Sequence, residues 1–412
     1  MRLRPVPLPL FRLLSLALML AAVPCLAAQQ AASAALPPIT ATMKSDPLTR
    51  SAFDHYYNLE YDQAVKEFER DLEQHPQDPF AVNHLINALM FRELYRTGAL
   101  DTSLYANNSF INKKTYPVDP AVKQRLQDLT QRALGLEEAR LKLAPNDVDT
   151  LYARGTTLGL RATYIGLVDK AWYSALRSAL AARHDQERVL ELDPTYADAK
   201  TLVGTHNYVI AGLPWMIKVA AAVVGVSGSR QKGLEQLQEA AAAGGETAVD
   251  ANVILGLFYR REQKYDEALK RVRGLIAAHP RNFLFLLEEA NLLNAAGHGS
   301  EAIAAYGRIV QQGKAGYFAD PHLELAAFGL GDALRGQRQY PDALAAYESV
   351  NQYPHRDPEL RQRADLSAGE LDDVLQKRDQ ALAKYKDVIA QNSSTPEADL
   401  ARKHLKQPYR MP

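Results

Sequence analysis

The 412-residue chain carries 48 basic and 48 acidic residues, so its formal net charge is zero and neither nucleic acid nor another polyanion is favoured as a partner. It has a single cysteine, which excludes an internal disulfide. Helix-favouring residues are abundant and β-branched runs are scarce, so we expect helix almost throughout.

The segment 1–27 is typical of a secretory signal peptide. A head with three arginines precedes an apolar run over 13–23, and Cys25 and Ala27 supply the small residues that signal peptidase accepts. The run is too short to cross a ~30 Å hydrocarbon core comfortably as a permanent helix. The residue before Cys25 is proline, which argues against lipidation. We therefore expect cleavage after Ala27, a flexible lead-in over 28–46 and a periplasmic or secreted mature protein.

Small residues recur at a fixed interval in the later part of the chain. Ala290 follows Gly256 by 34 positions, and Ala302 follows Ala268 by 34. A period of this size predicts a stack of helix pairs, each too small to bury its own apolar face. Small residues at such positions let paired helices approach closely.

The residue types resemble the tetratricopeptide repeat (TPR) family, whose unit has a small residue and an aromatic in its first helix, alanine in its second and proline at its end. Here Gly256, Tyr259, Ala268 and Pro280 fill those places. The resemblance implies an all-α fold, an α-α superhelix (a TPR solenoid) of about eight helix pairs. We expect irregular repeats with helical insertions over 47–245, then regular repeats and a capping helix over 246–412.

Three insertions depart from a plain array. The segment 97–119 is either a functional loop or solvated filler. The segment 160–178 keeps helical periodicity and should lengthen both helices of the third pair, with its apolar side chains in the core. The apolar segment 208–228 is interrupted by Pro214 and Lys218, which favours a buried helix over a spanning or membrane-surface helix. With the residues after it, this segment also resembles a eukaryotic TPR family associated with mitochondria and inclusion-body clearance.

In the TPR family the first helix of each pair lines a concave groove. By position, the resemblance implies that a partner protein or peptide would meet these polar side chains: Asn83, Asn87, Tyr152, Thr156, Arg260, Asn291, Asn294, Asp332 and Arg335. Asparagines one helical turn apart can bond both N–H and C=O of an extended peptide. A solvated polar face is the alternative.

No motif for catalysis, a cofactor or a metal stands out, because the chain lacks HExxH and a Gly-Lys-Ser/Thr phosphate loop. We therefore predict a non-enzymatic extracytoplasmic scaffold that binds a protein or peptide and supports complex assembly, with no catalytic residue and no cofactor. Two alternatives stay open. One is a membrane-attached assembly factor that uses the segment 208–228. The other is an enzyme with a site around Tyr164, Trp172, His206 and Trp215, which an abnormally titrating His206 in a pocket would favour.

Overall fold

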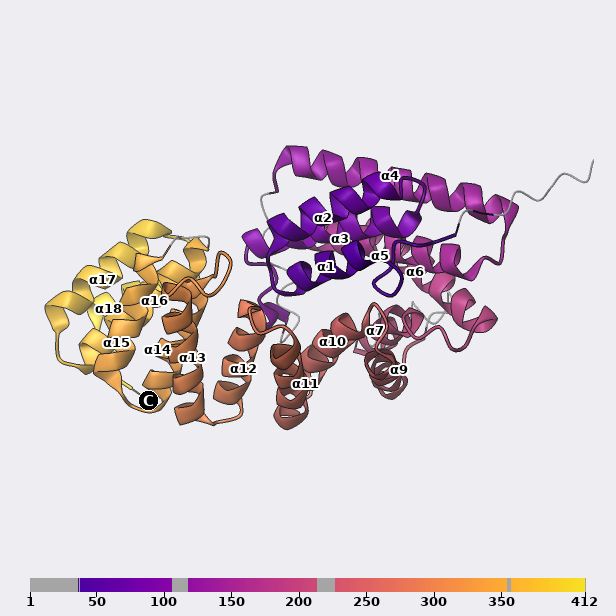
Figure 1. The fold of residues 1–412 in the computed structure, drawn as a ribbon. Helices are drawn as coiled ribbons and strands as arrows, with labels where there is room; N and C mark the ends of the chain where they lie inside the picture. Colours follow the sequence, from indigo (N-terminus) through magenta and orange to yellow (C-terminus); the bar gives the residue numbers. More distant parts are fainter. Residues whose placement is uncertain (1–35, 37, 106–117, 213–226, 354–356, 412) are drawn as a thin grey trace, which may run out of the picture. The chain divides into compact units, whose positions relative to one another are not determined.

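The structure is a computed structural model that describes residue 36 and residues 38–105, 118–212, 227–353 and 357–411 (Figure 1). Within these residues the chain forms 17 α-helices and no strand. Consecutive helices pack against each other along the chain, as the all-α TPR prediction required. The predicted signal peptide 1–27 lies outside the described residues.

The first four pairs contain the longest helices. Their bounds are α1 Pro47–Tyr57 with α2 Tyr61–Gln74, α3 Pro79–Arg96 with α4 Pro120–Leu143, α5 Val148–Leu167 with α6 Trp172–Leu192, and α7 Ala199–Gly212 with α9 Arg230–Ala243. Many of these helices begin at a capping side chain. Asp46, Asp78, Asp119 and Asp147 each accept hydrogen bonds from first-turn amides, which satisfies donors that have no intrahelical partner.

The later pairs are shorter and more uniform. They are α10 Ala248–Arg261 with α11 Tyr265–Ala278, α12 Phe283–Ala295 with α13 Gly299–Lys314, α14 Leu323–Gly336 with α15 Tyr340–Ser349, and α16 Pro358–Val374 with α17 Arg378–Gln391. Helix α18, Pro396–Lys406, packs on α17 and covers the end of the array. The predicted count of about eight pairs plus a cap is confirmed.

Within a regular pair, a tyrosine of the second helix fills the space above a glycine of the first. A Cβ added to Gly331 would lie 2.6 Å from Tyr347, and one added to Gly369 would lie 2.9 Å from Tyr385. Both tyrosines are fully buried. Glycine is required at these places because any side chain would displace a packed ring.

Helices α7 and α9 approach even more closely, through their backbones. A Cβ on Gly233 would lie 2.6 Å from the carbonyl oxygen of Gly204, and one on Gly204 would lie 2.8 Å from that of Gly233. The side chain of Ser229 caps α9 by accepting from the amide of Lys232. The fourth pair is therefore fixed by contact between two main chains, which cannot adapt as side chains do.

The tight turn within a pair repeatedly places one residue in the left-handed region. These residues are Leu59, Gln263, Gly297, Arg338 and Gln376, with φ between 58° and 84°. Only one of the five is glycine. This backbone strain is tolerated because the helices on both sides fix the turn.

Part of the predicted flexible lead-in 28–46 is held in place, which corrects that expectation. The amides of Thr40 and Ala41 donate to the Asp78 carboxylate at 2.7 and 3.1 Å, and Ala41 is fully buried. One carboxylate that accepts two amides fixes the backbone there, so the ordered chain begins before Pro47.

The insertions have different outcomes. The segment 160–178 lengthens α5 and α6 to 20 and 21 residues, as predicted. Residues 208–212 end α7, and the rest of the apolar segment as far as 226 lies outside the described residues, as do residues 106–117 of the loop 97–119. In the part of the chain that the structure describes, no helix is both long and apolar enough to cross a membrane.

Candidate functional site

The candidate site is a cavity of about 740 Å³ lined by side chains of α1, α3, α5, α6, α7 and α10. This volume lies within the usual range for small-ligand sites, and most of the lining is apolar. Leu160, Leu167, Trp172 and Leu176 form one wall, and all four come from the segment 160–178. The lengthening of the third pair therefore builds a wall of the cavity.

The rim of the cavity exposes unusually large apolar side chains. Trp172 is 39% exposed, Leu176 is 54% exposed and Val209 is 45% exposed. The prediction that the segment 160–178 buries its apolar side chains in the core is therefore wrong for Trp172 and Leu176. Clustered apolar exposure beside a cavity is typical of a binding surface.

One end of the cavity is polar and acidic. His84 on α3 bonds Glu246 through Nε2 at 2.7 Å, and Asp250 on α10 accepts a hydrogen bond from the Tyr57 hydroxyl at 3.3 Å. Asp198 lines the same end and accepts from the amide and hydroxyl of Thr247. Glu246 is thus paired with His84, while Asp198 and Asp250 lie near it with no basic partner of their own among these contacts, so this end of the cavity favours a cation or a hydrogen-bond donor.

The protonation of these groups follows from their surroundings. Burial opposes the charged imidazole of His84, but Glu246 and Asp71 outweigh it and raise its pKa to about 9. Burial raises the pKa of Asp250 to about 7, and the charges of Glu246 and Asp198 push it in the same direction. Asp250 therefore ionises near neutral pH, and an incoming cation would favour its charged form.

Four of the predicted groove residues meet at this cavity. Asn83, Asn87, Tyr152 and Thr156 all line it, because α3 and α5 present their inner faces to it. Asn83 is not available to a peptide, however. It is buried, donates to the Ala153 carbonyl at 2.9 Å and accepts from Thr157 at 2.7 Å. Its role is to tie α3 to α5, which corrects the prediction for this residue.

The other five predicted groove residues lie outside the cavity, and most are engaged within the array. Arg260 forms a buried ion pair with Glu288 at 2.6 Å, and Arg335 pairs with Glu370 at 2.9 Å. Strong pairs of this kind would have to break before either arginine could bind a peptide, so the structure does not support them as free groove contacts.

The asparagine and aspartate of the regular pairs are held by tyrosines. The hydroxyl of Tyr306 donates to Asn291 at 2.6 Å, and that of Tyr347 donates to Asp332 at 2.6 Å. Asn291 is half-buried, and its oxygen accepts from a tyrosine of the second helix instead of being free for a peptide. Asn294 is half-buried and lies outside the cavity, so it stays a prediction.

The residues proposed for an enzyme do not converge. Trp172 and His206 line the cavity, Tyr164 lines a different hollow beside α4, and Trp215 lies outside the described residues. Burial, together with the charge of Arg183, lowers the pKa of His206 to about 4, so this imidazole is neutral at pH 7. That titration is the feature that would favour an enzyme. Among the described residues, however, we find no hydrogen bond from His206 to an acid or hydroxyl that would make a catalytic pair.

The polar end of the cavity could not be foreseen from the sequence. Asp198 and Asp250 are 52 positions apart, and His84 comes from a third segment. No spacing rule joins them, since their proximity depends on how three helix pairs pack.

A family model described as Regulator of microtubule dynamics protein 1-3 matches residues 112–282, less than half of the chain but including α5, α6 and α7. This is not the family that the segment 208–228 resembled at the sequence level. No curated protein matches the chain.

Solved structures with a similar arrangement share little sequence. Pseudomonas aeruginosa PilF is 16% identical over 62% of this chain and 99% of its own, with a TM-score of 0.41. Yeast Tom70 is 13% identical over 88% and 89%, with a TM-score of 0.41. YrrB, described as a TPR protein with an unusual peptide-binding site, is 15% identical over 65% and 97%, with a TM-score of 0.32. The chain has an all-α, TPR-like solenoid fold.

Proposed function

We propose that this protein is a non-enzymatic, extracytoplasmic scaffold that binds a segment of a partner protein in the 740 Å³ cavity. The partner would place apolar side chains against the wall of α5 and α6, and a lysine or arginine at the acidic end. This places the binding site in the irregular part of the array, and of the predicted groove residues it retains Asn87, Tyr152 and Thr156 as contacts.

The observation that carries the proposal is the pairing of an exposed apolar rim with buried acidity. Trp172 and Leu176 are exposed on one side of the cavity, while Asp198 and Asp250 line its inner end. An amphipathic segment with one basic residue would cover the rim and neutralise the carboxylates together. Burial of apolar surface supplies affinity, and the charge fixes orientation.

A peptide panel tests this directly. We would screen fluorescent dodecapeptides rich in leucine and phenylalanine, each made with one arginine or with glutamate at the same place. We expect the arginine series to bind and the glutamate series to bind at least tenfold more weakly. Ala162→Trp should abolish binding because Ala162 lines the cavity and the added ring would fill it. Arg308→Ala, an exposed change on α13, is the control and should bind like wild type.

The pH dependence of the affinity distinguishes binding at the acidic end from non-specific apolar binding. Because the pKa of Asp250 is about 7, affinity for the arginine peptides should rise as the pH increases through 7. Asp250→Asn should weaken binding above pH 7 and flatten this dependence. Equal binding of both peptide series, or an affinity that Ala162→Trp leaves unchanged, would contradict the proposal.

The proposed location rests on the segment 1–27. Its basic head, short apolar run and small residues at 25 and 27 support export. N-terminal sequencing of the protein from its native cells should begin at Ala28. A chain that still contains Arg12, or a lipid mass on Cys25, would contradict export by this route.

A further inference from the structure

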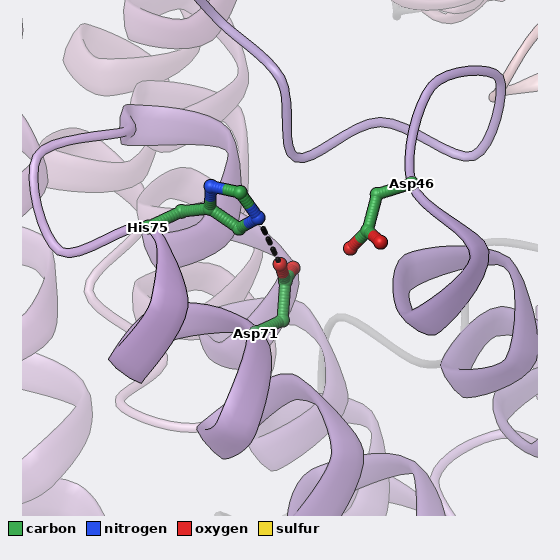
Figure 2. Close-up of side chains that lie close together, drawn as sticks. All are labelled: Asp46, Asp71 and His75. Atoms are coloured by element: carbon green, nitrogen blue, oxygen red, sulfur yellow. Dashed lines mark ion pairs between the residues drawn. The ribbon is translucent and has the colours of Figure 1, made fainter.

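A second cluster of polar side chains lies at the end of the first helix pair and plays no part in the proposed binding. Figure 2 shows Asp46, Asp71 and His75 with their side chains directed toward one another. Asp46 precedes α1, Asp71 lies in the last turn of α2, and His75 follows α2 directly. One ligand atom from each of the three lies within 4.8 Å of the others.

The carboxylate of Asp71 points to a missing partner. Asp71 is fully buried, and its Oδ2 accepts a hydrogen bond from Thr49 at 3.1 Å. Its Oδ1 is also buried but has no hydrogen-bond partner among the described residues. An unsatisfied buried carboxylate oxygen is costly, so native structures rarely leave one without a bound group.

The imidazole of His75 is oriented to bind the same missing group. Its Nδ1 lies 3.2 Å from the hydroxyl of Thr40, and its Nε2 lies 3.7 Å from Oδ1 of Asp71. The second distance is too long for a hydrogen bond. It is close to the separation of about 3.3 Å between two ligand atoms on a tetrahedral zinc ion. Nδ1–H donation to Thr40 would leave the Nε2 lone pair free, which is the usual arrangement of a metal-binding histidine.

Asp46 can join the set without losing its capping role. Its two oxygens accept the amides of Leu48 and Thr49 at 3.1 and 3.2 Å, and a carboxylate has further lone pairs. The neighbouring His84 bonds Glu246 at 2.7 Å, and its Nδ1 lies 4.0 Å from Oδ2 of Asp71, so it does not occupy Oδ1. The site therefore offers one nitrogen and two carboxylate oxygens, with a fourth position for water.

We propose that Asp46, Asp71 and His75 bind one divalent transition-metal ion, for which Zn²⁺ is the appropriate probe. An imidazole with two carboxylates suits such an ion, whereas an all-oxygen set would suit Ca²⁺ or Mg²⁺. The ion would join the start of α1 to the end of α2. It would thereby link the two helices of the first pair at the end where α1 begins and α2 ends.

Calorimetric titration of the untagged full chain, freed of metal with a chelator, tests the proposal. We expect Zn²⁺ to bind with one saturable site and to raise the melting temperature, and Ca²⁺ to do neither. His75→Gln should weaken Zn²⁺ binding at least tenfold and abolish the rise in melting temperature. Asp46→Asn, which keeps the helix cap, should weaken it similarly. The matched control is His298→Gln, an exposed histidine beside Glu301, which should bind Zn²⁺ like wild type.

Two results would overturn the proposal. One is the absence of a saturable Zn²⁺ site in the wild-type chain, which would mean that His75 and Asp71 contact each other without a bound ion. The other is a site that His75→Gln leaves unchanged. Because His75 lies at the end of a helix and is partly exposed, this variant should fold even if Asp71→Asn does not.

Discussion

The helices from α1 to α9 and those from α10 to α18 use one repeat plan but fill their interiors differently. In three pairs of the later part, a buried tyrosine of the second helix (α13, α15 or α17) packs on the first helix and bonds a polar residue there, as Tyr347 does with Asp332. In the earlier part, α5 and α6 are 20 and 21 residues long against 14 for α10 and α11. The longer helices extend beyond what one neighbour covers, and their inner faces line the cavity.

This difference in helix length indicates which pairs of a repeat protein can form a binding site. The regular pairs satisfy their polar groups within one pair, as for Asn291, or with the next pair, as for Arg260, and leave few of them for a partner. A pair with longer helices shares its inner surface with several others. The cavity thus collects side chains from residue 53 to residue 254, including the carboxylates of Asp198, Glu246 and Asp250.

The largest predicted effect concerns His84 in the irregular part. Because its folded-state pKa of about 9 lies above the unfolded value of 6.5, the stability it contributes is complete below pH 6.5 and is lost as the pH rises through 9. The shift corresponds to roughly 3 kcal/mol. His84→Gln should therefore have a much lower free energy of unfolding than wild type at pH 6. This difference between the two proteins should be smaller at pH 10 by about 3 kcal/mol.

Tryptophan fluorescence suits this measurement, because both tryptophans of the chain, Trp172 and Trp215, belong to the irregular part. Urea unfolding of wild type and His84→Gln at pH 6, 8 and 10 gives the difference in their free energies of unfolding. His298→Gln in the regular part is the control and should show no comparable change with pH. A difference of constant size would mean that the pair with Glu246 does not hold a charged imidazole.

The second prediction compares two glycines in helices of equal length. Gly233→Ala should destabilise by roughly 1–3 kcal/mol, because its methyl group would meet the Gly204 backbone at 2.6 Å. Gly274→Ala in α11 should instead stabilise by about 0.5–1 kcal/mol, since nothing lies within 4 Å of the added atom. Thermal unfolding followed by circular dichroism compares them. Effects of the same sign would show that α7 and α9 are not in backbone contact.

Much of the fold could be predicted from the sequence, because its determinants are local or nearly so. Gly331 and Tyr347 are 16 positions apart, and the pairing of a small residue with a large one can be recognised in the sequence. The cavity could not be predicted, because it depends on how far helices of different length extend past one another. The engagement of Asn291 by Tyr306 was missed although the 15-residue separation recurs for Asp332 and Tyr347. In other repeat sequences, a tyrosine 15 positions after a polar residue of the first helix therefore predicts that the polar residue is engaged within the pair.

The third prediction tests the register of the regular part. Ala268 is fully buried between α11 and its neighbours, whereas Ala242 near the end of α9 is exposed. Ala268→Leu should cost about 1–3 kcal/mol, since added methylenes overpack a closed contact. Ala242→Leu should stay within about 0.5 kcal/mol of wild type. Equal melting temperatures for the two variants would contradict the assigned faces of both helices.

The last prediction concerns the left-handed turns, where the two parts should respond in opposite directions. Gln263 is exposed and has a φ of 58°, so Gln263→Gly should stabilise by about 0.5–1 kcal/mol through relief of strain. Gly297→Ala, at the same turn of the next pair, should lose a similar amount.

Leu59 has the same backbone conformation in the first pair, with a φ of 63°. Its side chain, however, is buried and lines a small cavity together with Tyr57 and Phe285. Removing that side chain forfeits about 1.5–3 kcal/mol of apolar burial, which exceeds the strain relieved. Leu59→Gly should therefore destabilise where Gln263→Gly stabilises. Parallel urea titrations of the three variants decide this. If Leu59→Gly were as stabilising as Gln263→Gly, the turn of the first pair would contribute backbone strain alone and no packing.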